Sequence, residues 1–319
     1  MKPSRTIVVS DREPGLPYSK GMRATDIMVS GLSPFRAYQV AEEVETRLLD
    51  GGATQVTAGE VDELTAQVLQ DLAGERYAKN YLRWREVARL DVPLVILIGG
   101  ATGVGKSTIA TQLAVRLGIV RVVGTDAVRE VMRTMLAPEL LPSLHTSSFA
   151  AGKALREPPR SVDPVIAGFR EQTALVSVGV GALVQRAAME GSSAIIEGAH
   201  VVPGFFDLAP LEDRILAIPV VVAVDDEEVH RSHFVARSTD AAGRPFERYL
   251  AEFSNIRKVQ KYIRSQALSH GVPVVPNYHL DQALTAVIDL VIERAAARLQ
   301  PRGGRARSGR VAEVGGARP

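Results

Sequence analysis

The stretch that decides the fold of this chain is Pro93-Leu-Val-Ile-Leu-Ile-Gly-Gly-Ala-Thr-Gly-Val-Gly-Lys-Ser-Thr108. Its apolar run from Leu94 to Ile98 has the continuity of a strand buried in a parallel sheet. A glycine-rich turn of the form Gly-x-x-x-x-Gly-Lys-Ser follows, and residues 109–117 then have the apolar spacing of a helix. A strand, a glycine-rich turn and a helix in this order predict a loop that binds the phosphates of a nucleoside triphosphate.

The residue types in the turn suit that chemistry. The glycines let successive backbone N–H groups face the phosphates without interference from a Cβ atom, and the helix N-terminus adds partial positive charge. Lys106 can bridge the β- and γ-phosphates, and the Ser107 hydroxyl can take a coordination position of Mg²⁺. We therefore expect ATP and Mg²⁺ as cofactors. The residues expected to bind them in this turn are Gly100, Thr102, Gly103, Val104, Gly105, Lys106, Ser107 and Thr108.

The composition predicts a cytoplasmic protein with no membrane partner. Of the 319 residues, 46% are hydrophobic and 23% are charged, which is ordinary for a globular protein. The longest apolar runs, such as residues 218–224, are too short to span a bilayer, and residues 1–13 lack an apolar signal core. The absence of cysteine excludes disulfides, thiolate chemistry and zinc–thiolate sites.

The net charge of +2 is set by the last nineteen residues. Residues 301–319 hold five arginines and one glutamate, so the rest of the chain is slightly acidic. This Gly/Arg/Pro-rich segment has no periodicity and is expected to be a disordered tail. Because no basic stripe with interleaved aromatic residues occurs elsewhere, a nucleic-acid partner is disfavoured.

Residues 91–300 alternate strands and helices, which is typical of an α/β fold with a doubly wound parallel five-stranded sheet. The predicted strands are 94–99, 119–124, 193–197, 217–224 and 272–276. The predicted helices are 105–117, 126–136, 164–190, 226–238, 246–269 and 280–299. The long connection 137–163, rich in Pro, Ser and Gly, is expected to cover a substrate.

Residues 1–90 predict a smaller, mostly α-helical domain. A short strand is expected at 6–10. Helices are expected at 20–29, 34–49, 58–72 and 77–90. Thr57, with Glu60 three residues on, has the pattern of a capping box for the third of these helices.

Polar residues that follow the predicted strands are candidates for chemistry, because ligands of open α/β sheets lie outside the carboxyl ends of the strands. Asp126 is expected to face the γ-phosphate, where it can accept the proton of an acceptor hydroxyl or hold a Mg²⁺-bound water. A plain helix N-cap would also favour Asp there. Glu197 is expected to orient Mg²⁺. Asp225 is the rival carboxylate, but its strand leads directly into an arginine-bearing helix.

Cationic residues flank these carboxylates. Arg129 and Arg133 lie on one face of a predicted helix, where guanidinium groups can hold a second phosphate or a carboxylate. Pairing with surface acids is the alternative. Arg231 and Arg237 have the spacing of a lid that closes over a transferring phosphoryl group, although a solvated helix face has the same pattern. The expected catalytic residues are thus Lys106, Asp126, Arg231 and Arg237.

Four segments together resemble the 2-phosphoglycerate kinase family. They are residues 99–107, Val123-Gly-Thr-Asp126 with its two arginines, Leu144-His-Thr-Ser-Ser148, and Ile196-Glu-Gly-Ala-His-Val-Val-Pro-Gly204. Residues 17–21 and 31–34, ahead of the helix at 37–49, look like an ATP-cone domain. The resemblance implies a P-loop NTPase fold preceded by this ATP-cone-like domain. It leaves open whether that domain binds a second nucleotide or has a packing role.

The resemblance implies transfer of the ATP γ-phosphoryl group to the free hydroxyl of 2-phosphoglycerate, giving 2,3-bisphosphoglycerate. The expected substrate-binding residues are Arg129, Arg133, His145, Ser147, Ser148 and His200, although a structural role for His200 is an equal alternative. A kinase for another small phosphorylated acceptor and a nucleotide-sensing regulator are the rival functions. Assembly into a homo-oligomer is left open.

Overall fold

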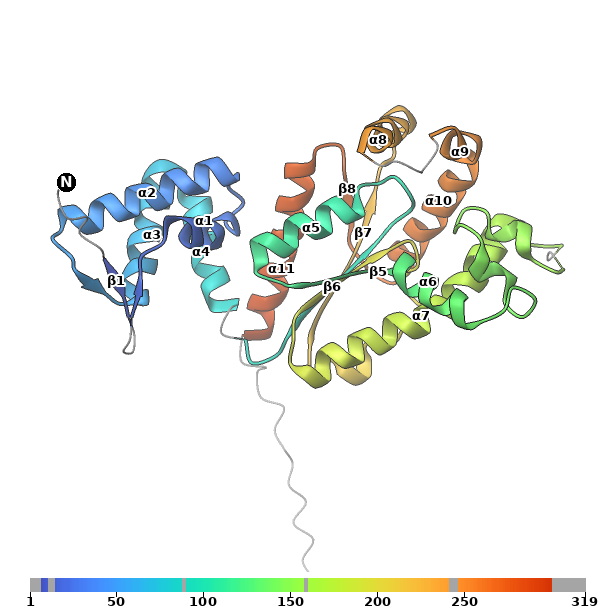
Figure 1. Ribbon diagram of the computed structural model, residues 1–319, viewed down its shortest axis with the longest axis horizontal. Helices are drawn as coiled ribbons and strands as arrows, with labels where there is room; N and C mark the ends of the chain where they lie inside the picture. The colour runs from blue at the N-terminus through green and yellow to red at the C-terminus, as the bar shows by residue number, and fades with distance from the viewer. Residues whose placement is uncertain (1–6, 11–14, 88–89, 158–159, 241–245, 300–319) are drawn as a thin grey trace, which may run out of the picture.

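A sheet of five parallel strands lies at the centre of the larger part of the molecule, in the order β5-β6-β4-β7-β8 (Figure 1). The computed structural model describes residues 7–10, 15–87, 90–157, 160–240 and 246–299. The strands are β4 (Leu94–Gly99), β5 (Arg121–Gly124), β6 (Ala194–Gly198), β7 (Leu216–Ala223) and β8 (Val274–Pro276). The expected doubly wound, parallel five-stranded sheet is confirmed.

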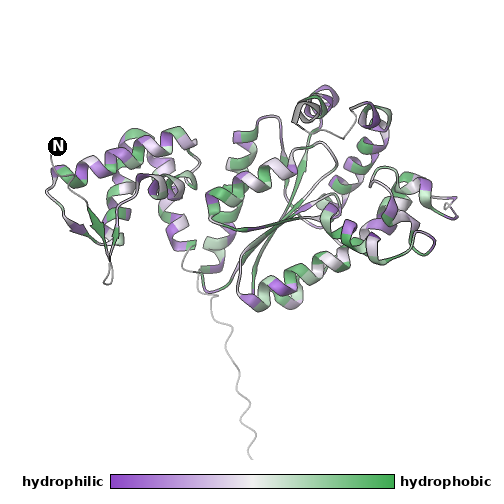
Figure 2. Cartoon of the chain, viewed as in Figure 1, coloured by the Kyte–Doolittle hydropathy of each residue, from purple (hydrophilic) through white to green (hydrophobic). Residues whose placement is uncertain are grey.

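The central strand β4 is buried on both faces, which is why its sequence is apolar without alternation. Leu94, Ile96 and Ile98 contribute to a core with α5 (Lys106–Leu117), α10 (Phe253–Ser269) and α11 (Leu280–Leu299). Val95 and Leu97 contribute to a second core with α7 (Pro164–Glu190). Figure 1 shows α5 and α11 on one side of the sheet and α7 on the other, and the strands are coloured mainly hydrophobic in Figure 2.

The remaining elements lie around the carboxyl ends of the strands. They are α6 (Thr125–Met135), α8 (Glu227–Asp240), α9 (Phe246–Ala251) and two short 3₁₀ helices, η1 (Pro142–His145) and η2 (Ala151–Ala154), in the long connection. A third 3₁₀ helix, η3 (Ala209–Leu211), precedes β7. None of the described helices is long and apolar enough to cross a lipid bilayer.

The prediction of one helix over 246–269 is wrong. Glu252 separates α9 from α10, with backbone angles φ −102° and ψ 10°, and its carboxylate accepts from Lys153 and from Asn255 Nδ2. The ion pair with Lys153 comes from a residue 99 positions away, so no local pattern could have indicated the break. This break places the short helix α9 next to the long connection.

The N-terminal region has its own small sheet and a separate core. Strands β1 (Val8–Val9), β2 (Leu16–Pro17) and β3 (Gln55–Val56) pair in the order β2-β1-β3, with α1 (Lys20–Met28), α2 (Pro34–Asp50), α3 (Ala58–Leu72) and α4 (Glu75–Val87). The predicted capping box is confirmed: Glu60 N–H donates to Thr57 Oγ1 at 3.1 Å, and Thr57 N–H donates to Glu60 Oε2 at 2.8 Å. The strands β2 and β3 were too short for the sequence to indicate.

The two regions meet through α4 and α11. Arg76 Nη2 and Asn80 Nδ2 on α4 donate to the carboxylate of Asp289 on α11, at 3.0 and 3.2 Å. The predicted basic tail, residues 301–319, lies outside the described residues.

Candidate active site

The glycine-rich turn between β4 and α5 adopts backbone angles that favour glycine at three of its positions. Gly100, Gly103 and Gly105 have positive φ, of +143°, +87° and +89°. A Cβ atom on Gly103 would lie 2.3 Å from the Phe234 ring, and one on Gly105 would lie 2.3 Å from Asn277 Nδ2. Both residues therefore allow neighbouring elements to approach the turn closely.

Those neighbours hold the carbonyl groups of the turn. His230 Nε2 donates to the Thr102 carbonyl and His233 Nδ1 donates to the Gly103 carbonyl, each at 2.9 Å. Asn277 Nδ2 donates to the Val104 carbonyl, also at 2.9 Å. Because the carbonyls are bound from outside, the turn has a fixed shape.

Lys106 and Ser107 begin α5 at the mouth of the turn. Lys106 Nζ donates to the Ala101 carbonyl at 2.7 Å. Ser107 Oγ donates to Glu197 Oε1 at 2.9 Å, which joins the end of β6 to the start of α5. A hydroxyl and a carboxylate side by side are hard oxygen ligands that suit Mg²⁺. Ser107 and Glu197 could therefore share one metal ion with the phosphates of a nucleotide.

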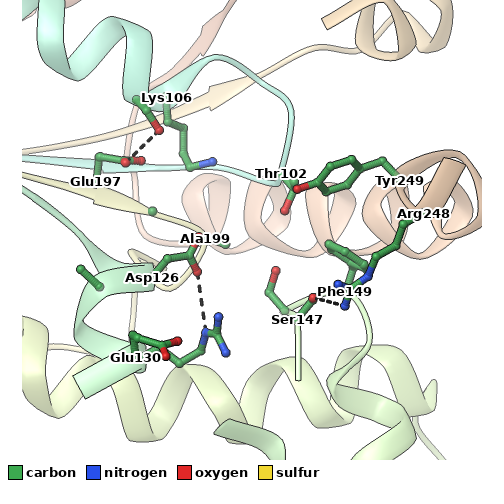
Figure 3. Close-up of a pocket in the computed structure, with 15 residues that line it drawn as sticks. Thr102, Lys106, Asp126, Glu130, Ser147, Phe149, Glu197, Ala199, Arg248 and Tyr249 are labelled. Carbon is green, nitrogen blue, oxygen red and sulfur yellow. Dashed lines mark hydrogen bonds and ion pairs between the residues drawn. The ribbon is translucent and has the colours of Figure 1, made fainter. Parts of the chain in front are cut away.

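A cavity of about 450 Å³ opens beside this pair, at the carboxyl ends of β4, β5 and β6 (Figure 3). Its polar lining includes Thr102, Lys106, Ser107, Asp126, Arg129, Glu130, Ser147, Ser148, Glu197, Arg248 and Tyr249. Asp126 lies in the first turn of α6, and 76% of its side chain is exposed. Its carboxylate is therefore open to a ligand in the cavity.

Arg129 reaches the cavity from the next turn of α6, and it also holds the neighbouring loop. Its Nη1 donates to the carbonyls of Leu144 and Thr146, at 2.9 and 3.0 Å. Its Nε lies 3.7 Å from Asp126 Oδ1. Arg129 thus fixes the loop that presents Ser147 and Ser148 to the cavity.

Several residues expected in the site do not line this cavity. Arg133 pairs with Glu130 at 2.9 Å, because α6 carries it one turn beyond Arg129. His145 Nε2 donates to the Leu136 carbonyl at 2.9 Å, and the Arg231 guanidinium lies 3.9 Å from the centre of the Phe253 ring. Thr108 lies on α5 beyond the lining residues, and the side chain of Arg237 is outside the described part of the chain.

The rival carboxylate Asp225 also lies elsewhere. It pairs with Arg264 on α10 and lines a different hollow from Glu197. Of the two carboxylates weighed for the metal, only Glu197 lines the cavity beside Ser107.

His200 is buried beneath the site and does not line the cavity. Thr125 Oγ1 donates to its Nδ1 at 3.0 Å, and its Nε2 donates to Gln172 Oε1 at 2.9 Å. Gln172 Nε2 in turn donates to the carbonyls of Ser143 and Thr146 in the long connection. His200 therefore supports the loop through Gln172, which corresponds to the structural alternative for this residue.

Burial lowers the pKa of both His200 and His230 to about 4. The ordinary value near 6.5 returns when the chain unfolds, so between pH 6.5 and 5 the unfolded chain binds protons that the folded chain does not. We expect the free energy of unfolding to decrease as the pH is lowered from 6.5 to 5, by up to about 1.4 kcal/mol per pH unit for each histidine. Urea unfolding at pH 7, 6 and 5 measures the slope.

The variant His200→Asn removes one of the two buried imidazoles, so its free energy of unfolding should change less steeply between pH 6.5 and 5 than that of wild type. A free energy of unfolding that is constant from pH 7 to pH 5 would contradict the protonation states given above.

Seven residues that line the cavity were not among the expected site residues: Ala127, Glu130, Phe149, Gly198, Ala199, Arg248 and Tyr249. Arg248 and Tyr249 come from α9, and Phe149 comes from the loop after η1. Arg248 Nη2 donates to Ser147 Oγ at 2.9 Å, and the rings of Tyr249 and Phe149 meet edge to face at 6.0 Å. Their only local signal was an arginine beside a tyrosine on a predicted helix, which is common on solvated faces.

The fold and this site define the class of the protein as a P-loop kinase, which uses ATP. The chain is 43% identical over 279 residues to 2-phosphoglycerate kinase of Thermococcus kodakarensis, covering 88% of this chain and 94% of that protein. It is 39% identical over 297 residues to 2-phosphoglycerate kinase of Pyrococcus furiosus, covering 93% of this chain and 96% of that protein. The chain belongs to the 2-phosphoglycerate kinase family.

No protein-family model matches the chain. The solved structure of shikimate kinase from Acinetobacter baumannii in complex with shikimate aligns with 68% of this chain and 99% of that chain, with 14% identity and a TM-score of 0.37.

Proposed function

We propose that the protein transfers the γ-phosphoryl group of ATP to the free hydroxyl of 2-phosphoglycerate, giving 2,3-bisphosphoglycerate and ADP. The observation that carries this proposal is the 43% identity to a protein named for that substrate, over 94% of its length. The cavity supports it, because one polar space adjoins both the phosphate-binding turn and the Ser147–Ser148 loop.

The proposed reaction assigns one task to each group at the nucleotide end. Lys106 leaves the Ala101 carbonyl and neutralises charge on the transferred phosphoryl group. Ser107 and Glu197 would hold Mg²⁺, which would supply further neutralisation of that charge. Asp126 accepts the proton of the acceptor hydroxyl. The oxygen of that hydroxyl bonds to the γ-phosphorus while the bond between the γ-phosphorus and ADP breaks.

The proposed acceptor contacts are Arg129, Ser147 and Ser148, which line the cavity opposite the turn. A transfer role for Arg231 would require it to leave the Phe253 ring, and Arg237 is proposed on its sequence position alone. Residues 1–90 are proposed to form an ATP-cone-like domain and 91–300 the kinase domain, followed by the tail at 301–319. The α4–α11 contacts support a packing role for the first of these domains.

The test is ADP release by the purified protein with Mg²⁺-ATP and a panel of acceptors. We expect stimulation by 2-phosphoglycerate, with 3-phosphoglycerate and glycerate much weaker, and a bisphosphorylated product by mass spectrometry. Stimulation by a different acid would support kinase activity but would show that the acceptor is not 2-phosphoglycerate. Binding of ATP without stimulation by any acceptor would contradict the proposal.

A further inference from the structure

One cation of the cavity belongs to none of the groups assigned to the reaction so far. Arg248 extends from α9 to the side of the cavity that faces Lys106 and Glu197 (Figure 3). Its Nη2 donates to the neutral hydroxyl of Ser147 at 2.9 Å, so this contact brings no negative charge to the guanidinium group. The nearby carboxylate of Glu252 also acts on Arg248, but it forms its ion pair with Lys153. A guanidinium group held in this way can still bind an anion.

The position of Arg248 does not depend on that hydrogen bond alone. Tyr249 packs edge to face on Phe149, and Lys153 pairs with Glu252 at the end of α9. These contacts hold α9 against the loop from Ser147 to Lys153. Arg248 is therefore delivered to the cavity by the packing of a helix.

The two ends of the cavity differ in what they can bind. At the end near the turn, Lys106 and the Ser107–Glu197 pair suit a nucleotide and its metal. At the other end, Arg129 Nη1 is already bound to two backbone carbonyls. Ser147 and Ser148 line the cavity there, beside Arg248. One guanidinium group and two hydroxyl groups suit the several oxygens of a phosphate dianion.

We propose that Arg248, with the hydroxyl groups of Ser147 and Ser148, binds the phosphate that the acceptor already carries. Arg248 thereby makes the enzyme prefer a phosphorylated acid over the same acid without phosphate. This inference rests on the proposed function and adds a specificity residue to it. Arg248 donates to Ser147, which belongs to the loop proposed to contact the acceptor. Arg248 therefore differs from the groups proposed to surround the transferred phosphoryl group.

The test compares steady-state kinetics of wild type and Arg248→Gln with 2-phosphoglycerate and with glycerate. We expect the KM for 2-phosphoglycerate to rise about 10- to 100-fold, the loss of a charge-assisted hydrogen bond, with little change in kcat or in the KM for ATP. The preference for 2-phosphoglycerate over glycerate should fall by the same factor, and Arg248→Lys should recover part of it. Arg186→Gln, which removes an exposed guanidinium group of α7 that pairs with Glu190 away from the cavity, is the matched control and should keep the preference.

Two kinetic outcomes would overturn the inference. One is a fall in kcat of Arg248→Gln with an unchanged KM for the acceptor, which would place Arg248 at the transferred phosphoryl group. The other is the same loss of preference in Arg186→Gln, which would make it a general effect of removing a cation from the protein. If wild type phosphorylates no acid of the panel, the proposed function fails separately. Calorimetric titration of 2-phosphoglycerate into wild type and Arg248→Gln then decides, because equal affinities would overturn the inference.

Discussion

Replacing Lys106 with alanine is expected to lower the rate of phosphoryl transfer by at least about 10³-fold, the scale of a charged group that stabilises the transition state. Lys106 is a cation at the mouth of the turn, and its Nζ donates to the Ala101 carbonyl of the turn. The measurement is single-turnover formation of product from radiolabelled ATP and the acceptor.

The fold should survive the change at Lys106. The Lys106 side chain lines the cavity, so in the alanine variant water can donate a hydrogen bond to the Ala101 carbonyl in its place. Circular dichroism and the urea midpoint should therefore match wild type. Lys261→Ala, at an exposed position of α10, is the control for loss of a lysine. Wild-type turnover in Lys106→Ala would remove the lysine from the mechanism.

Asp126→Asn is expected to lower kcat by about 10²- to 10⁴-fold, the usual contribution of a general base. The amide keeps the size of the carboxylate but cannot take the proton of the acceptor hydroxyl. Because Asp126 lies opposite the turn and is largely exposed, the affinity for ATP should remain close to that of wild type. Measuring kcat together with the dissociation constant of ATP separates the two effects.

Glu130→Gln provides a close comparison for Asp126→Asn. Glu130 lies one helical turn further along α6, lines the same cavity and pairs with Arg133. Its loss removes the same charge from the same helix without removing the proposed base, so kcat should change by less than about 10-fold. Equal losses of rate in the two variants would indicate a general effect of charge and exclude a base at Asp126.

The sequence was sufficient for the parts of the molecule whose geometry is local. The apolar run of β4, the glycines of the turn and the capping box at Thr57 each depend on residues within a few positions of one another. Ser107 and Glu197 are 90 residues apart, but Glu197 lies at the end of β6 and Ser107 follows the turn after β4. The topology of a parallel sheet brings such ends together.

Local sequence patterns could not predict which side chains face the cavity, because this depends on contacts between distant segments of the chain. Arg129 and Arg133 share a helix face, yet only the first faces the cavity, because α6 extends past its edge. Arg231 has the spacing of a lid residue but lies on an aromatic ring contributed by α10. Arg248 was not recognised because its partner at the cavity, Ser147, lies 101 positions away in the chain.

The external support of the phosphate-binding turn has a consequence for how nucleotide affinity is set. Three carbonyls of the turn are held by side chains from α8 and from the segment after β8, far apart in the sequence. The conformational entropy of the turn is therefore lost during folding, before any nucleotide arrives. Because the turn is already ordered, nucleotide binding loses little free energy to ordering the turn. Nucleotide affinity is thus expected to depend on His230 and His233 of α8 and on Asn277 after β8, through the shape of the turn that they hold.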